Sequence, residues 1–112
     1  MTNTYKQLGQ LRPANTTAAT IYSPATDTQT IIKSIVVCNT TAITAYCRIF
    51  VDDDGTTYDE TTAQAWDVPV VPSVAPLTIE VNICMNDSTG NLAVRTDTAN
   101  ALTFTVSGME KT

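Results

Sequence analysis

Two segments of the chain alternate regularly between apolar and polar residues. In Leu77–Ile83 every odd-numbered residue is apolar and every even-numbered residue is polar. Leu102–Ser107 repeats the pattern with its apolar residues at even positions, and Gly108 follows as the expected end of the segment. Because successive side chains of a β-strand point to opposite faces, each segment predicts a strand with one buried face. We expect one core to contain Ile79, Val81, Ile83, Phe104 and Val106.

A third segment, Ile31–Cys38, is apolar at every position except Lys33 and Ser34. Apolar residues on both faces of a strand are typical of the middle of a sheet that is covered on two sides. Tyr46–Val51 also has the character of a strand and follows after a polar connection. We therefore expect Tyr46–Val51 to pair with Ile31–Cys38.

Weaker strand signals are separated by turn residues. Asp54–Gly55 supplies a residue that is free to take a positive φ, and Asn86–Asn91 is a polar run that contains a glycine. Both predict turns. The shorter strand candidates are Gln7–Leu11, Ala19–Ser23, Leu92–Thr96 and a further piece near Thr56–Tyr58.

The middle of the chain carries three prolines. Pro69, Pro72 and Pro76 lack an amide donor, so we expect Val68–Pro76 to be an extended edge or crossing segment and not a central strand. Glu60–Trp66, which precedes it, contains good helix formers and is the only helical candidate. Seven residues make one or two turns of helix at most.

These elements predict an all-β protein. The chain has 22 threonines, whose β-branched side chains pack well on a pleated sheet and lose rotamer freedom in a helix. Its 112 residues suit one hydrophobic core and hence a single domain, 1–112. Seven to eight short strands with frequent turns predict a two-sheet antiparallel sandwich, either a small Ig-like fold or a jelly roll. The pattern does not choose between the two.

The distribution of charge is uneven. The formal net charge is −5, which argues against nucleic acid as a partner because such binding relies on clustered Lys and Arg. Residues 1–48 hold four basic residues and one acidic residue, whereas residues 49–94 hold eight acidic residues and no basic one. This asymmetry indicates either solvated loops or one face adapted to a partner and another that is repulsive.

The cysteines and the hydropathy point to a reducing compartment. The first residues form no apolar signal segment, and no run approaches the length of a membrane span, so we expect synthesis in a cytosol and no membrane partner. Cys38, Cys47 and Cys84 are accordingly expected to be reduced. A Cys38–Cys47 bridge across the intervening connection is the weaker alternative.

The residues offer little for catalysis. The chain has no histidine, no glycine-rich phosphate loop and no CxxC pair, which removes most hydrolase arrangements and zinc sites. Asp52–Gly55 supplies carboxylates for a cation, but it lacks the spacing of a calcium loop and is better explained as a solvated turn. We expect no enzyme activity, no cofactor and no metal.

Three short motifs carry a resemblance to a known group. Tyr5–Gln10 (YKQLGQ), the segment ending at Asn39 (SIVVCN) and the closing strand that finishes in GME at Glu110 resemble small proteins encoded among the virion genes of tailed phages. The likeness spans most of the chain, and its motif positions include Lys6, Asn39 and Glu110. The acidic segment Asp52–Glu60 departs from a typical member.

The resemblance implies a non-enzymatic structural protein of the virion, assembled in the host cytoplasm. A capsid decoration (cement) protein that binds the major capsid protein is the first expectation. A tail- or baseplate-associated protein is the alternative within the class. A carbohydrate-binding module that grips host surface glycans through Trp66 and the tyrosines is the alternative from another class.

The candidate interface lies mainly in residues 1–12. This segment carries apolar side chains with few polar neighbours and two of the six basic residues, so we expect it to contact another molecule in a homo-oligomer or a shell. Pairing with a strand of the same chain would also order it. Trp66 is either a core plug or an exposed interface residue. The candidate interface residues are Tyr5, Lys6, Leu8, Leu11, Arg12 and Trp66.

Overall fold

The computed structural model describes residues 2–72 and 75–112 and contains eight β-strands and no helix in these ranges. The strands are β1 (Asn3–Leu11), β2 (Ala19–Tyr22), β3 (Gln29–Asn39), β4 (Ala45–Asp52), β5 (Ala63–Val70), β6 (Leu77–Met85), β7 (Asn91–Thr96) and β8 (Leu102–Lys111). None of the described residues therefore belongs to a helix that could cross a membrane.

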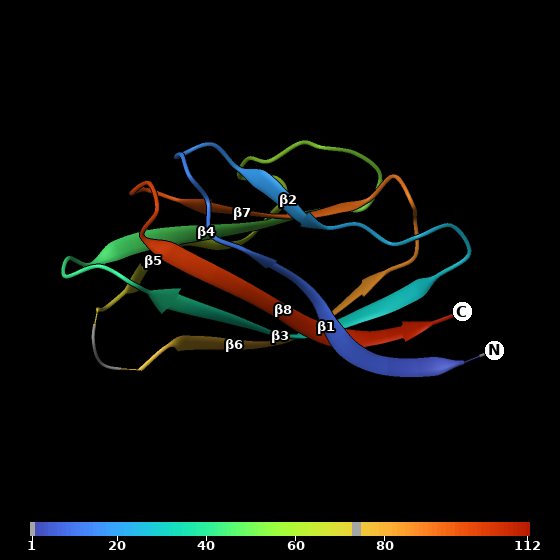
Figure 1. Ribbon diagram of the computed structural model, residues 1–112. Helices are drawn as coiled ribbons and strands as arrows, with labels where there is room; N and C mark the ends of the chain where they lie inside the picture. Colours follow the sequence, from blue (N-terminus) through green and yellow to red (C-terminus); the bar gives the residue numbers. More distant parts are fainter. Residues whose placement is uncertain (1, 73–74) are drawn as a thin grey trace.

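The strands form two antiparallel sheets of four, which lie one above the other in Figure 1. The first sheet has the order β1-β8-β3-β6 and the second the order β2-β7-β4-β5. Strand pairs β1–β8, β2–β7, β3–β6 and β4–β5 are nested along the chain, as in one long hairpin rolled onto itself. This order is that of a jelly roll. The expected antiparallel sandwich is confirmed, and the strand order decides between the two topologies left open by the sequence.

The core lies between the sheets. Phe104 and Val106 are fully buried in it, and Ile79, Val81 and Ile83 are partly buried and pack against it, as their alternating pattern predicts. Both sheets contribute to the core, so neither could bury its apolar face alone. The large side chains with less than 2 % exposure in this core include Ile32, Ile35, Ile49, Leu92, Leu102, Phe104, Val94 and Val106.

The interpretation of Ile31–Cys38 as a strand covered on both faces is wrong. The strand does lie inside its sheet, between β8 and β6, but a β-bulge at Lys33 changes which residues face the core. Thr30 and Ile32 are buried before the bulge, and Ile35 and Val37 are buried after it. A single covered face with this one-residue shift produces the nearly continuous apolar run.

Three further expectations about strands are corrected. β4, which contains Tyr46–Val51, pairs with β5 and β7 and not with β3. The nested strand order places β3 in the first sheet and β4 in the second. Gly108 does not end the last strand, which continues to Lys111. Thr56–Tyr58 is not a strand.

The helix expected at Glu60–Trp66 is absent, because β5 begins at Ala63 and pairs with β4. β5 is an edge strand, which accommodates Pro69 without an unmade ladder bond. The edge character expected for Val68–Pro76 is thus confirmed for residues 68–70, while Ser73 and Val74 lie outside the described residues.

Candidate binding surfaces

The N-terminal segment is an edge strand of the first sheet. β1 pairs with β8 along its length, from Asn3 opposite Lys111 to Leu11 opposite Phe104. Thr2 and Thr112 exchange both backbone hydrogen bonds, at 3.0 and 3.1 Å. Pairing within the chain is therefore sufficient to order this segment, and its order requires no partner.

One side of β1 carries unpaired backbone groups. In an antiparallel ladder the residues alternate between those bonded to the neighbouring strand and those whose N–H and C=O point away. Thr2 is a bonded residue, and the register continues without a shift as far as Gln7. The N–H and C=O groups of Asn3, Tyr5 and Gln7 therefore point away from β8, toward the open edge of the sheet.

Most of the side chains predicted to form the interface turn toward their own chain. Leu8 and Leu11 pack against the core, and the Nη2 of Arg12 donates to the carbonyl of Asn100 at 2.6 Å. Lys6 forms an ion pair with Glu110, with Nζ 2.7 Å from Oε1. Tyr5 differs, since it is 78 % exposed and lies next to the open edge.

The Lys6–Glu110 ion pair belongs to a network that joins the sheets. The Tyr22 hydroxyl, on β2 of the second sheet, donates to Glu110 Oε2 at 2.5 Å and lies 2.6 Å from the Thr30 hydroxyl on β3. Hydrogen bonds from Lys6 and then Tyr22 hold the pKa of Glu110 below its usual value. Burial and the bond to Glu110 raise the pKa of Tyr22 to about 12.

Asn39, the third motif position, also joins the sheets. Its side-chain Nδ2 donates to the carbonyl of Val70 at 2.8 Å, which connects β3 with β5. The other two motif positions, Lys6 and Glu110, are 104 residues apart along the chain and meet in one ion pair within the first sheet. Of the three motif residues, Asn39 and Glu110 thus bond from the first sheet to the second.

Trp66 lies on the second sheet, remote in the fold from β1. Its side chain is 41 % exposed on the outer face of β5, so it does not plug the core. The guanidinium carbon of Arg48 lies 3.6 Å from the centroid of its ring, and Phe50 meets it edge-on at 6.2 Å between ring centroids. One face of the indole ring is therefore covered by a cation.

Arg48 also forms a two-pronged ion pair with the residue that follows Trp66. Its Nε and Nη2 donate to the two carboxylate oxygens of Asp67, at 2.7 and 3.0 Å. Asp67 has a φ of 51° inside a bulge of β5, a backbone conformation that non-glycine residues seldom adopt. The bond from Arg48 lowers the pKa of Asp67.

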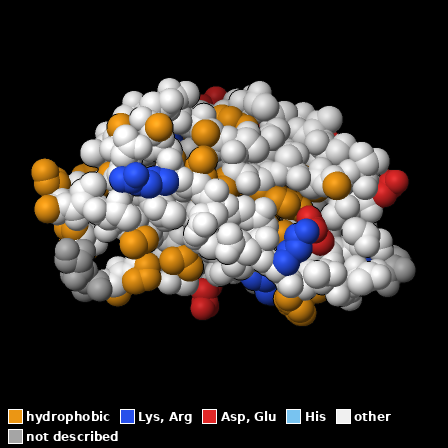
Figure 2. Space-filling view, viewed as in Figure 1, with side chains coloured by type: hydrophobic (Ala, Val, Ile, Leu, Met, Phe, Trp, Pro, Cys, Tyr) orange, Lys and Arg blue, Asp and Glu red, His pale blue; other side chains and the backbone are white. Residues whose placement is uncertain are grey.

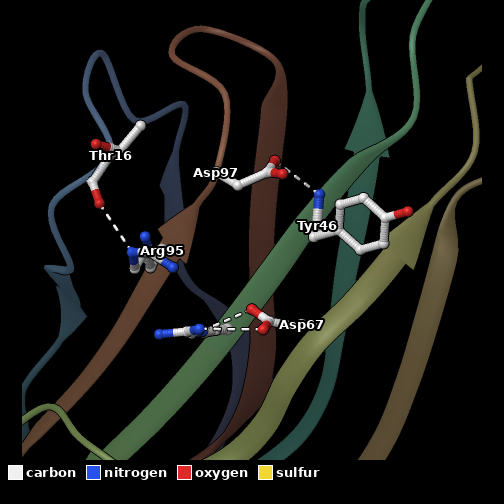
Figure 3. Close-up of polar contacts among 6 residues, drawn as sticks. Thr16, Tyr46, Asp67, Arg95 and Asp97 are labelled. Atoms are coloured by element: carbon white, nitrogen blue, oxygen red, sulfur yellow. Dashed lines mark hydrogen bonds and ion pairs between the residues drawn. The ribbon is translucent and has the colours of Figure 1, made fainter.

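A hollow of about 400 Å³ lies beside this pair on the outer face of the second sheet. Its lining consists of Tyr46, Arg48, Asp67, Arg95 and Asp97. Figure 3 shows that Arg95 and Asp67 come from different strands and that Asp97 and Tyr46 meet at one side. Asp97 Oδ1 accepts the backbone N–H of Tyr46 at 2.8 Å. The hollow combines basic, acidic and aromatic groups.

The acidic segment folds over the same sheet. Tyr58 packs against Phe50, with ring centroids 6.0 Å apart, and its hydroxyl lies 2.7 Å from that of Thr20. Phe50 is thereby buried although it faces outward from the sandwich. This segment thus forms a cover over one end of the outer face, which hydrophobic alternation alone does not indicate.

The three consecutive aspartates could meet around an ion, since Asp52, Asp53 and Asp54 offer oxygens within 4.8 Å of one another. The oxygens of Asp52, however, already accept the backbone N–H groups of Asp54, at 3.2 Å, and Thr57, at 2.8 Å. These bonds, from Thr57 first, lower the pKa of Asp52. The carboxylate of Asp52 therefore stabilises the turn.

The basic residues of the N-terminal half do not form one face. Lys6 bonds to Glu110 on the neighbouring strand of the first sheet, Lys33 bonds to Asn82 on the same sheet, and Arg48 lies on the second sheet. Figure 2 likewise shows basic side chains at separate places on the face in view. The basic residues that are concentrated in the N-terminal half of the sequence thus lie on different surfaces of the folded protein.

Sequence reasoning identified Trp66 but missed the hollow beside it. Charged residues at outward positions of strands are ordinary, and only the pairing of β4 with β7 places Arg48 opposite Arg95. Comparison with known proteins adds no assignment, because no family model and no curated protein matches the chain.

Proposed function

We propose that the protein is a non-enzymatic structural protein of a phage virion, a capsid decoration protein that docks on the shell through the open edge of β1. The observation that carries this proposal is the run of outward backbone groups at Asn3, Tyr5 and Gln7 beside an exposed tyrosine. Such an edge is a template for a strand of another chain, either the major capsid protein or a second copy. The edge is open, long and free of proline.

Two further considerations support a structural role. The jelly roll is a fold of viral capsid and lectin domains, although a fold by itself does not establish a function. The motifs at Tyr5–Gln10, Asn39 and Glu110 resemble those of small virion proteins. Both considerations are analogies, and the open edge supplies the physical mechanism that they lack.

Cryo-electron microscopy of the parent particle tests the location. Density for the eight-stranded sandwich on the outer surface of the head is the expected result. Density on the tail or baseplate would replace the shell role by the tail-associated alternative. Purified particles without the chain, as judged by mass spectrometry, would contradict any virion role.

Point substitutions at the edge test the docking surface better than removal of residues 1–10, since removal would also expose the core beneath Leu8. Tyr5→Pro deletes one outward N–H but leaves the bonds to β8. We expect it to abolish binding to undecorated particles or self-association in light scattering, while Tyr5→Ala weakens binding less. Tyr46→Ala, at a half-exposed tyrosine of the other sheet, is the matched control. Unchanged binding by Tyr5→Pro would contradict the edge proposal.

The geometry gives the carbohydrate-binding alternative less support than the number of aromatic residues in the sequence suggested. Tyr46 is the one tyrosine that offers an exposed ring on this face, because Tyr5 lies on the first sheet, Tyr22 is buried, and Tyr58 packs against Phe50 with its hydroxyl bonded to Thr20. Arg48 covers one face of the indole ring. A sugar would therefore have to be recognised by more than an open aromatic platform.

A further inference from the structure

Arg48 and Arg95 are paired directly across two neighbouring strands, β4 and β7, on the outer face of the second sheet. Side chains in this relationship start about 5 Å apart at Cβ, and like charges placed there destabilise a sheet. Both guanidinium groups line the same hollow. An arrangement of this kind is stabilised by an anion that both cations can reach.

Only one of the two cations forms a direct ion pair with a carboxylate among the described residues, although the charge of Arg95 also contributes to the lowered pKa of Asp67. Asp67 holds Nε and Nη2 of Arg48, which leaves Nη1 without a bonded partner among the described residues. Arg95 donates through Nε to the carbonyl of Thr16 at 2.9 Å. Within the described ranges its two terminal nitrogens have no hydrogen-bond partner, and no carboxylate lies within ion-pairing distance of it.

The nearby acid is held away from Arg95 by other bonds. Asp97 Oδ1 accepts the backbone N–H of Tyr46 and the hydroxyl of Thr98, at 2.8 and 3.1 Å. Figure 3 shows Asp97 turned toward Tyr46, with Arg95 on the opposite side. The terminal edge of Arg95 thus remains available to a group from outside, in the geometry that suits a carboxylate.

We propose that this hollow binds the carboxylate of an acidic sugar unit, with Arg95 as the principal anion-binding residue and Arg48 as the second. A volume of about 400 Å³ accommodates one or two sugar rings. The ring of Tyr46, 43 % exposed at the rim, offers an apolar face to the sugar, and Asp67 and Asp97 offer acceptors for its hydroxyl groups.

The charge of the protein favours a single carboxylate over a polyanion. The net charge is −5, and the acidic segment that covers Phe50 lies on the same sheet. A nucleic acid or a heavily sulfated chain would be repelled at longer range, whereas one carboxylate gains from short contacts with Arg95 and Arg48 that act against the repulsion of Asp67 and Asp97. This site is independent of the β1 edge, so a negative result here would leave the proposal of shell docking intact. A positive result would name the class of ligand for the carbohydrate-binding alternative.

Titration of the full chain, followed by NMR chemical shifts, tests the proposal with glucuronate, glucose and acetate as probes. We expect saturable, millimolar binding of glucuronate that shifts the amide signals of β4 and β7, weaker binding of acetate and none of glucose. Arg95→Gln should weaken glucuronate binding by about tenfold, the loss expected for one two-pronged charged contact. Arg12→Gln, which alters a guanidinium at the other sheet, should change it less than twofold.

Asp67→Asn gives a test with the opposite sign. Asparagine tolerates the positive φ of this position, and removal of the carboxylate frees Arg48 for the ligand. We expect glucuronate affinity to rise severalfold, an effect that mere damage to the fold would not produce. If Arg95→Gln proves unfolded by circular dichroism, Arg95→Lys, which keeps the charge and loses the fork, should still reduce affinity.

Four results would overturn the proposal. Absence of saturable glucuronate binding at tens of millimolar would show that the hollow is not a binding site. Glucuronate binding that Arg95→Gln leaves unchanged would show the same. Equal binding of acetate and glucuronate would show that the site recognises a carboxylate alone and not a sugar. Tighter binding of a glutamate-rich peptide than of glucuronate identifies a protein partner in place of a sugar.

Discussion

The hydroxyl of Tyr22 donates a hydrogen bond to the carboxylate of Glu110, 2.5 Å away, and thereby connects the last strand of one sheet with the first strand of the other. Lys6 neutralises the same carboxylate from β1. Glu110 is near the end of β8, and both termini emerge at the same end of the sandwich in Figure 1. Interactions across this end hold together strands that are far apart in sequence.

We expect Tyr22→Phe to reduce the free energy of unfolding by about 1–3 kcal/mol, because it removes the partner of two polar groups, Thr30 and Glu110, in a buried or partly buried setting. Equilibrium urea denaturation measures the loss. Thr20→Val removes a hydroxyl contact with Tyr58 at an exposed position and should have a smaller effect. Equal losses for the two variants would contradict the special position of Tyr22.

The same network predicts a loss of stability at both ends of the pH scale. The pKa of Tyr22 is raised in the folded state, from 10.0 to about 12, so its contribution is complete below pH 10 and disappears as pH rises toward 12. The pKa of Glu110 is lowered from 4.5, so its contribution is present above that value and is lost as pH falls below it. The melting temperature, measured as a function of pH, should fall at the alkaline end and at the acidic end. The alkaline slope should become shallower in Tyr22→Phe, and an unchanged slope would contradict this assignment.

Gly9→Ala should destabilise the protein by about 1–3 kcal/mol, the usual range for an overpacked site. A Cβ at Gly9 would lie 2.4 Å from the backbone carbonyl oxygen of Ile21, so the two sheets would have to move apart where β1 passes β2. At Gly55 the nearest atom is a side-chain oxygen of Asp52, at 3.2 Å. Gly55→Ala is therefore the control with a smaller expected loss. Denaturation midpoints compare the two, and equal losses would argue against a close approach at Gly9.

Thiol reactivity should separate the three cysteines, all of which are free in the structure. Cys38 and Cys84 are exposed, whereas Cys47 is buried and its pKa is raised to about 11 by burial. A thiol reagent should modify two groups rapidly in native, unreduced protein and the third only on unfolding. Recovery of a single thiol after denaturation would reveal a bridge and contradict the structure.

Chelation of divalent cations should leave the melting temperature unchanged at fixed ionic strength. The carboxylate of Asp52 already accepts two backbone N–H groups, and the turn is satisfied without an ion. Calorimetry with and without a chelator checks this. A decrease of several degrees would show that Asp52–Asp54 holds a cation in the native state.

The sequence located seven of the eight strands, two from regular alternation and the others from apolar or β-branched runs bounded by turn residues, but it predicted a helix where β5 begins, for a physical reason. The bulge at Trp66 and Asp67 breaks the alternation between Ala65 and Val68, and the alanines before it favour a helix locally. Pairing with β4 overrides that preference. The bulge at Lys33 misled the assignment of β3 in the same way.

The binding surfaces were harder to predict than the strands, because they depend on register. Tyr5 was a candidate because the first twelve residues combine apolar and basic side chains, and Trp66 because it is the single tryptophan, and both side chains are exposed in the structure. The opposition of Arg48 and Arg95 follows from the pairing of β4 with β7, and the ion pair of Lys6 with Glu110 follows from the pairing of β1 with β8. No local pattern encodes contacts between strands so distant along the chain.

The position of β8 between β1 and β3 has a consequence for biosynthesis. Until Leu102–Lys111 has left the ribosome, β1 has no neighbour in its sheet and β3 has only β6. The nascent chain must therefore keep the apolar strands of this sheet unpaired until β8 emerges, and then close contacts of high sequence separation, which is slow. The rate of folding should thus respond more to chaperones that hold the emerging chain than to substitutions in the early hairpins.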